Sequence, residues 1–470
     1  MTAMVLRILC AVAAFFQTIL FALSGSEHIL NVNIFEEHQV FEGFGTSSCW
    51  WSQLIDDEKQ ADEIARLLYD KETGLGLKTY RYNVGAGEND IDNSKIWLRE
   101  RRTESFYYFN EATGRFKYDF TRDANARRML DKAIEYGAQE VILFCNSPHW
   151  SMTLNGRGYG GNDEHKSNLP EENYPLFVDY LLTIADKFVE MGYPVVAISP
   201  VNEPQWGWNG DYISQEGCHF EPDECVKLLE MFATEMQKRG VKYELRGPES
   251  GQLTWQYFDY IDKFLQSEIL KDYCKYYSGH SYWMDNDLSA KTWFGNKMRE
   301  EYPHVKFEMS EWCELPQKLD TKSIDSGLWM ADIIIQDLSL MDAVSWCNWT
   351  AVHGDGLIDN ERGPLEIINR YWAYKQFSRF IQPGMVRAGI AENAENSGLS
   401  FVCFKSSRQA VVVIVNKNEN AETVKLTGIT GRRNAYITAD GINCEQDNSV
   451  LSGQKVNLPA KSIVTVTAGW

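Results

Sequence analysis

The stretch Val195-Val-Ala-Ile-Ser-Pro-Val-Asn-Glu-Pro204 decides the fold. Its first half is a short apolar run rich in β-branched residues, which predicts a buried strand. Its second half places Asn202 and Glu203 in a polar tail just after that strand. Helical patterns flank it at residues 174–191 and 222–239, and each ends at a glycine, as helices commonly do. This order of elements indicates a parallel sheet with helical crossovers.

The same pattern repeats over most of the chain. Helical patterns also occupy residues 57–69 and 123–136. Apolar runs that end in short polar or aromatic tails lie at residues 40–46, 79–84, 141–145, 195–199, 243–246, 276–278, 305–309 and 343–346. Eight strands with intervening helices predict an α/β fold, a (β/α)8 TIM barrel, over residues 40–378.

A different pattern begins after residue 378. Short runs rich in β-branched residues alternate with turns, and no long helical pattern intervenes; they lie at residues 402–404, 410–415, 423–426, 434–438, 455–458 and 463–467. These runs predict a small antiparallel β-sandwich. Residues 28–35 also have a strand pattern. We therefore expect a second domain built from both ends of the chain, residues 26–39 plus 379–470.

Residues 1–25 have the features of a signal peptide. Arg7 precedes an apolar run at residues 8–23, and small residues follow at 24–26. A membrane anchor is the alternative, but the run is short for a spanning helix and no second apolar stretch follows. We therefore expect a secreted protein that is free of the membrane after signal removal.

Composition argues against several classes of partner and cofactor. The chain has 66 acidic and 46 basic residues, a net charge of -20, which disfavours nucleic acid binding. Mean hydropathy is -0.38, typical of a soluble protein. Cysteines and histidines lack metal-ligand spacing, so we expect no metal and no organic cofactor. Cys218 and Cys225 flank one loop, which leaves a disulfide between them open. The sequence does not predict an oligomeric state.

Two glutamates at predicted strand ends point to the chemistry. Glu203 follows the fourth strand and Glu311, in Ser310-Glu-Trp312, ends the seventh. Functional groups of such barrels cluster at these ends, and strands four and seven face each other. Glycoside cleavage needs one carboxyl as acid and another as nucleophile. We predict Glu203 as acid/base and Glu311 as nucleophile of a retaining hydrolase, with carboxyls about 5–5.5 Å apart.

Two other carboxylates compete for these roles. Glu308 lies in the middle of the seventh strand, where we expect a buried ion pair, with Lys306 as the candidate partner. Glu249 ends the fifth strand, where it would contact substrate or hold a loop.

Five motifs together resemble a known family. They are Phe41-Glu-Gly-Phe-Gly45, Asn146-Ser-Pro148, Val201-Asn-Glu-Pro204, Gly279-His-Ser-Tyr282 and Ser310-Glu-Trp312. The set resembles glycoside hydrolase family 30, in the clan of (β/α)8 retaining hydrolases, over nearly the whole mature chain. The segment 41–51, in which Gly-Thr-Ser leads to paired tryptophans, is most similar to the endo-β-1,6-galactanase branch.

The resemblance implies a set of substrate-binding residues. Arg81 would support the nucleophile carboxylate, Asn202 would bind the sugar 2-hydroxyl, and His280 or Tyr282 would bond Glu311 or the sugar. Arg81 as a neutraliser of the barrel interior, and His280 as a core residue, are the alternatives. Aromatic contacts to sugar are expected from Trp50, Trp51, Trp150, Trp346 and Trp349, with one of the first two in the core.

Electrostatics supports the two catalytic roles independently. A positive Arg81 beside Glu311 is expected to lower the pKa of that carboxyl, and nearby negative charge to raise the pKa of Glu203. Opposite shifts would yield an acid and a nucleophile at one pH.

The expected activity is hydrolysis of a β-linked polysaccharide, most specifically plant (arabino)galactan. Alternatives within the family are a β-xylanase or glucuronoxylanase and a β-glucosidase or β-1,6-glucanase. An inactive carbohydrate-binding barrel is the non-enzymatic alternative. Insertions at residues 88–118, 151–173 and 205–220 are expected to shape the substrate site. In the first, Arg99, Arg101 and Arg102 either meet a glucuronic acid decoration or form a solvated cluster.

Overall fold

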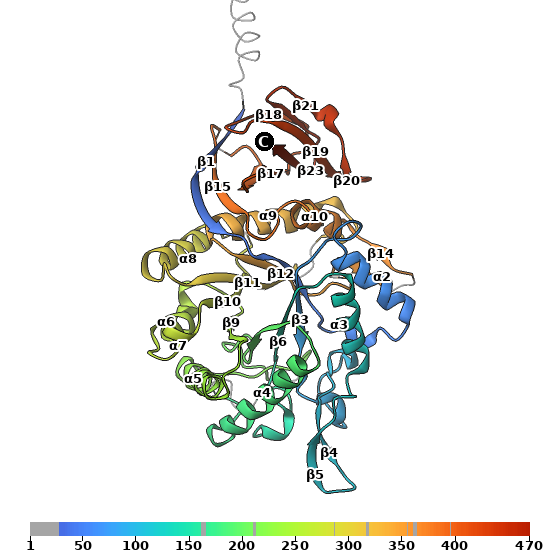
Figure 1. Ribbon diagram of the computed structural model, residues 1–470, viewed down its shortest axis with the longest axis vertical. Helices are drawn as coiled ribbons and strands as arrows, with labels where there is room; N and C mark the ends of the chain where they lie inside the picture. Colours follow the sequence, from blue (N-terminus) through green and yellow to red (C-terminus); the bar gives the residue numbers. More distant parts are fainter. Residues whose placement is uncertain are drawn as a thin grey trace, which may run out of the picture.

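The computed structural model describes residues 28–160, 166–209, 213–285, 287–315, 319–354, 356–360, 364–394 and 396–470 (Figure 1). The expected signal peptide lies outside the described residues. Within these ranges, no helix combines the length and apolar character that crossing a bilayer requires.

Nine parallel strands form the first sheet, in the order β8-β7-β6-β3-β2-β12-β11-β10-β9. Their bounds are β2 (Gly43–Ser47), β3 (Thr79–Asn83), β6 (Glu140–Phe144), β7 (Val195–Ser199), β8 (Glu244–Leu245), β9 (Pro248–Ser250), β10 (Tyr276–His280), β11 (Lys306–Trp312) and β12 (Ser345–Asn348). Only residues 246 and 247 separate β8 from β9, which form the two ends of the sheet. The sheet therefore curls round on itself, as in a TIM-like barrel. The predicted fifth strand is split into β8 and β9.

Helices surround this sheet (Figure 1). They are α2 (Glu58–Tyr69), α3 (Ala124–Tyr136), α4 (Tyr174–Glu190), α5 (Pro222–Arg239), α6 (Phe258–Gln266), α7 (Leu270–Tyr273), α8 (Leu288–Glu301), α9 (Ile324–Leu340) and α10 (Asn369–Ser378). The limits of α5 follow from its sequence. Glu221 and Glu224 form a capping box at its start, and Gly240 ends it in the left-handed conformation. Two short hairpins, β4 (Tyr107–Asn110) with β5 (Arg115–Tyr118) and β13 (Ile358–Asp359) with β14 (Glu366–Ile367), lie in loops.

The second sheet has ten strands in the order β20-β19-β23-β17-β16-β15-β1-β18-β22-β21. Their bounds are β1 (Ile29–Val40), β15 (Val386–Glu392), β16 (Leu399–Lys405), β17 (Gln409–Asn416), β18 (Glu422–Thr427), β19 (Arg432–Ala439), β20 (Ile442–Gln446), β21 (Leu451–Ser452), β22 (Lys455–Leu458) and β23 (Ser462–Gly469). Strand β1 pairs antiparallel with β15 and parallel with β18, so both ends of the chain contribute. Hydrogen bonds join the strands in one continuous, mostly antiparallel order, and they enclose an apolar core of their own; the division into the two sheets of a sandwich stays a prediction.

Helices α9 and α10 lie between the two sheets (Figure 1). The Gln376 side chain donates a hydrogen bond to Thr438 Oγ1 (2.8 Å), and Thr465 Oγ1 donates to the Gln376 carbonyl (2.9 Å). The rings of Phe380 and Tyr436 lie 4.5 Å apart. The second sheet therefore supports the helices that follow β11 and β12.

Candidate active site

A cavity of about 600 Å³ lies among the segments that follow the strands of the first sheet. Its volume is within the usual range for small-ligand sites. Six tryptophans line it: Trp50, Trp51, Trp206, Trp208, Trp283 and Trp349. The flat, apolar faces of such rings match the C–H surface of a pyranose.

Glu203, which follows β7, and Glu311, in β11, both line this cavity. Together with His280 they offer one ligand atom each, and these atoms lie within 4.8 Å of one another. Retaining glycosidases hold their carboxyls about 5–5.5 Å apart, whereas inverting enzymes need about 6.5–9.5 Å. The short separation therefore fits the retaining geometry predicted from the sequence.

The backbone of Glu203 adopts a left-handed conformation, with φ of 44°. Such a conformation costs about 1–3 kcal/mol and persists only where the surroundings enforce it. Here the Glu203 amide donates to the Glu249 carbonyl (2.9 Å), and Trp208 Nε1 donates to the Glu203 carbonyl (3.1 Å). These two bonds fix the residue at its strand end.

Arg81 lies beneath the cavity and is completely buried. Its Nη1 donates to Glu311 Oε2 (3.3 Å) and to the Ser310 carbonyl (2.8 Å), while Nη2 donates to Glu249 Oε1 (3.2 Å). On the other oxygen of Glu311, Tyr282 donates its hydroxyl to Oε1 (3.1 Å). Both oxygens of Glu311 are thus held from the protein side.

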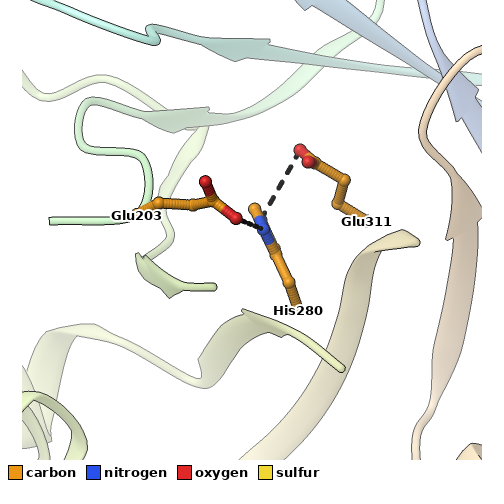
Figure 2. A group of neighbouring side chains, drawn as sticks. All are labelled: Glu203, His280 and Glu311. Carbon is orange, nitrogen blue, oxygen red and sulfur yellow. Dashed lines mark hydrogen bonds and ion pairs between the residues drawn. The ribbon is translucent and has the colours of Figure 1, made fainter. Parts of the chain in front are cut away.

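His280 lies between the two carboxyls (Figure 2). Its Nδ1 lies 3.1 Å from Glu203 Oε1, and its Nε2 lies 3.2 Å from Glu249 Oε2 and 3.6 Å from Glu311 Oε2. Burial alone would lower the pKa of His280, but the charge of Glu311 and the bonds to Glu203 and Glu249 outweigh it and raise the pKa to about 10. His280 is therefore a cation at neutral pH and donates from both nitrogens.

Glu249, in β9, is an acidic member of this network that sequence reasoning left undecided. It is buried, and it accepts hydrogen bonds from Ser199 (2.8 Å) and Ser310 as well as from Arg81 and His280. Burial would raise its pKa, but Arg81 and His280 outweigh burial and lower the pKa to about 2. Glu249 is thus a fixed negative charge that holds Arg81 and His280 in place.

Glu308 forms a buried ion pair, as expected of a mid-strand glutamate, but with a different partner. It binds Arg246 and accepts a hydrogen bond from Ser278 (2.6 Å). Lys306 instead pairs with Glu42. The partner proposed from sequence is therefore wrong. Arg246, in the segment between β8 and β9, occupies the place beside the Glu308 carboxylate.

The pKa of Glu311 differs in direction from the sequence-based expectation. Burial raises it to about 7, although His280 and Arg81 act to lower it. Two cations, Arg81 and His280, face the three carboxyls of Glu203, Glu249 and Glu311. The raised pKa of Glu311 therefore sets the pH above which the proposed nucleophile is ionised.

The same three groups, Glu203, His280 and Glu311, are close enough to hold a metal ion in principle. A histidine ligand must be neutral, with a free nitrogen lone pair. His280 instead uses both nitrogens in hydrogen bonds to carboxylates, and its raised pKa keeps it charged. The donor set therefore favours a hydrogen-bonded network over a metal centre.

Several predicted substrate-binding residues also lie at the cavity. Trp50 and Trp349 line it with their rings 5.0 Å apart and nearly perpendicular. Trp51 lines it but is almost wholly buried, and it donates to the Ser47 carbonyl (3.0 Å). Asn202 is buried and is not among the residues that line the cavity, and its Oδ1 has no hydrogen-bond partner among the described residues.

Two predicted tryptophans do not line the cavity. Trp346 is completely buried, donates to Asp337 Oδ2 (2.9 Å) and packs against Tyr374 of α10, so it belongs to the helix–sheet core. Trp150 packs against Phe116 of the β4–β5 hairpin. A position at the end of a strand therefore did not distinguish these buried rings from the rings that line the cavity.

Cys218 and Cys225 are both free and buried, so they do not pair.

Sequence reasoning did not assign Trp206, Trp208 and Trp283 to the site. The first two fall in the predicted insertion at residues 205–220, and Trp283 directly follows the Gly-His-Ser-Tyr motif. Their positions in the sequence could have indicated the site, because the segments that hold them directly follow two strands of the first sheet, β7 and β10.

Comparison with known proteins agrees with this architecture. The chain is 26% identical over 376 residues to an endo-β-1,6-galactanase from Hypocrea rufa, covering 73% of each chain. A conserved exported protein from Bacteroides fragilis superimposes with a TM-score of 0.83 at 23% identity, covering 94% of this chain and all of that one. The catalytic domain of GH30 xylanase C from Talaromyces cellulolyticus gives 0.73 at 19% identity, covering 93% and 99%.

The family model for O-glycosyl hydrolase family 30 matches residues 27–360, well over half of the chain. The match includes both cavity glutamates, Arg81 and His280. This protein therefore belongs to glycoside hydrolase family 30 and is a glycoside hydrolase.

Proposed function

We propose that this protein is a retaining endo-β-1,6-galactanase acting on plant (arabino)galactan, with Glu203 as acid/base and Glu311 as nucleophile. The observation that carries the retaining assignment is the separation of at most 4.8 Å between carboxylate oxygens of these residues. Support for the substrate comes from the similarity to the Hypocrea rufa endo-β-1,6-galactanase and from the paired tryptophans at the end of β2.

In the first step, ionised Glu311 attacks the anomeric carbon of the bound sugar. Glu203 gives its proton to the glycosidic oxygen as the bond to the leaving chain breaks. The products are a glycosyl ester on Glu311 and a free sugar hydroxyl. Arg81 and Tyr282 hold the attacking carboxylate, so little rotational freedom is lost in reaching the transition state.

In the second step, Glu203 is the base. It takes a proton from water, whose oxygen attacks the anomeric carbon and releases Glu311. Two inversions give net retention. His280 is protonated in the free enzyme, since its pKa is about 10. Its charge stabilises the ionised form of Glu311 before the attack.

The cavity walls support binding of a neutral pyranose chain. Trp50 and Trp349 present apolar rings beside Glu311. Arg101 also lines the cavity, with its guanidinium 4.5 Å from the centre of a Trp50 ring. The attraction between a cation and an indole face favours this position of the Trp50 ring. The paired, hydrogen-bonded glutamates argue against the inactive carbohydrate-binding alternative.

Product analysis on three polymers tests the proposal. Purified protein is incubated with β-1,6-galactan, glucuronoxylan and β-1,6-glucan, with Glu311→Ala as the inactive control. We expect a ladder of β-1,6-galacto-oligosaccharides from the first polymer alone. Preferential release of xylo- or gluco-oligosaccharides would assign the substrate to the family's other activities. Release of monosaccharide alone would contradict endo action.

We also propose that the protein is secreted, on the basis of the apolar run at residues 8–23. Determination of the mature N-terminus from culture supernatant tests this proposal. An N-terminus near residue 26 is expected, and recovery of the chain only with its first residues intact would contradict it.

A further inference from the structure

The tryptophans that line the cavity form two groups according to the strands that they follow, and we call the regions around these groups the two halves of the cavity. Trp50 and Trp349 follow β2 and β12, on the side of Glu311. Trp206 follows β7, as Glu203 does, and Trp283 follows β10. The proposed reaction needs the leaving chain to bind where Glu203 delivers its proton. The second half is therefore the place for the leaving chain.

Trp206 lies directly beside the carboxyl of Glu203. A Cβ added to Gly251 would lie 2.5 Å from Glu203 Oε1 and 2.9 Å from Trp206 Nε1, so both atoms meet at that glycine. Trp206 Nε1 is buried and has no hydrogen-bond partner among the described residues. It is thus a donor next to the acid, at the position of the first sugar hydroxyls of a leaving chain.

Trp283 extends this surface outward. Its ring lies 5.2 Å from that of Trp206 at 82°, and Tyr257 supports Trp206 from another side at 5.4 Å. Trp283 remains 51% exposed, although it lines the cavity. The exposed Trp283 ring continues the apolar surface of the Trp206 ring toward solvent. A ligand that extends out of the cavity can therefore pack against both rings.

The backbone conformation of this segment is also unusual. Trp283 has φ of 57° and Trp208 has φ of 51°, and both line the cavity as Glu203 does. A bulky residue in the left-handed region is disfavoured, and such residues cluster at ligand sites. The fold thus holds the Trp283 ring outward at a conformational cost that core packing does not require.

We propose that Trp206, Trp283 and Tyr257 form an aglycone platform that binds at least two pyranose units of the leaving chain. This inference rests on the proposed function, because it takes Glu203 as the acid. On this inference, the platform favours leaving groups of several sugars, and Trp50 and Trp349 do not. Internal bonds with sugars on both sides are then cleaved faster than terminal ones.

The test compares two substrates, of which only one has a sugar chain as its leaving group. One is the polysaccharide that the wild type cleaves, and the other is the β-glycosyl fluoride of the same sugar, whose fluoride leaves the platform empty. Trp283→Ala and Tyr257→Ala are compared with Trp470→Ala, which removes an equally exposed ring (50%) from the second sheet. Thermal unfolding checks that each variant is folded.

We expect Trp283→Ala to lower kcat/KM on the polysaccharide by about tenfold, with the fluoride within about twofold of wild type. Tyr257→Ala should act in the same direction, and Trp470→Ala should change neither substrate. An added sugar acceptor should increase transglycosylation from the fluoride in the wild type but not in Trp283→Ala.

Equal losses on both substrates, or an unchanged rate on the polysaccharide, would overturn the platform. Cleavage of xylan or glucan in place of galactan would contradict the proposed substrate only. In that case the same comparison on the cleaved polymer still decides the platform.

Discussion

His280 Nδ1 lies 3.1 Å from Glu203 Oε1, so a buried cation contacts the residue that must act as acid and base in turn. The opposite nitrogen of the same ring bonds Glu249, whose pKa of about 2 makes it a permanent anion. This arrangement fixes the ring between the carboxyls of Glu203 and Glu249.

Activity should fall on acidification through neutral pH. The nucleophile Glu311 must be ionised, and burial raises its pKa to about 7 in the free enzyme. Below this pH the carboxyl is protonated and cannot attack. A pH profile of kcat/KM, which reports the free enzyme, should therefore lose about tenfold per unit below pH 7. A profile that stays flat down to pH 5 would show that Glu311 is ionised throughout.

His280→Asn should shift that acid limb to higher pH. The charge of His280 lowers the pKa of Glu311 against burial, so its loss lets the pKa rise further. At pH 7 a smaller fraction of Glu311 is then ionised, and activity should fall by at least about tenfold. His38→Asn, an exposed histidine on β1, is the matched control. A lower maximal kcat/KM with the acid limb at an unchanged pH would mean that His280 positions its neighbours and that its charge does not lower the pKa of Glu311.

Glu203→Ala should make the rate depend on the leaving group. Loss of the acid should cost about 10²–10⁴-fold on polysaccharide but far less on aryl glycosides whose phenols leave without a proton. Azide should then restore turnover and give the β-glycosyl azide, because it attacks the glycosyl ester from the side that water uses. Formation of the α-azide would instead identify Glu203 as the nucleophile.

Gly251→Ala should inactivate the enzyme without unfolding it. The new Cβ would lie 2.5 Å from Glu203 Oε1, so the carboxyl must move. A displacement of about 1 Å at a reacting group can cost about 10²-fold in rate. Gly469→Ala, where the nearest atom is 4.0 Å from the added Cβ, is the control. Wild-type kcat with an unchanged unfolding temperature would show that Glu203 adapts freely.

Much of the fold could be predicted from the sequence because the signals are local and repeated. Each apolar run of the first sheet is followed by a polar tail, and glycines such as Gly240 mark helix ends. The splitting of the fifth strand into β8 and β9 was not predictable, because Arg246 and Gly247 follow an uninterrupted pattern. The order of the strands in the second sheet depends on pairings such as β1 with β18, nearly 400 residues apart.

Glu203, Glu311 and Arg81 could be assigned to the site from their positions at strand ends. The roles of the tryptophans and of Glu249, and the pKa of Glu311, depend on burial, which the sequence does not reveal. Trp346 and Trp349 follow the same strand pattern, yet one packs on Tyr374 in the core and the other lines the cavity. The raised pKa of Glu311 reflects complete enclosure, which a neighbouring cation in the sequence does not reveal. Glu249 is important because Arg81 and His280 converge on it from β3 and β10.

Trapping of the covalent intermediate tests the central claim most directly. A 2-deoxy-2-fluoro-β-glycoside of the cleaved sugar, with an activated leaving group, should form the ester but hydrolyse slowly, because the fluorine destabilises both transition states. Mass spectrometry of the intact protein should then show one added sugar. Peptide mapping should place it on Glu311. A label on Glu203 or Glu249, or steady turnover with no labelled protein, would contradict the assignment of Glu311 as nucleophile.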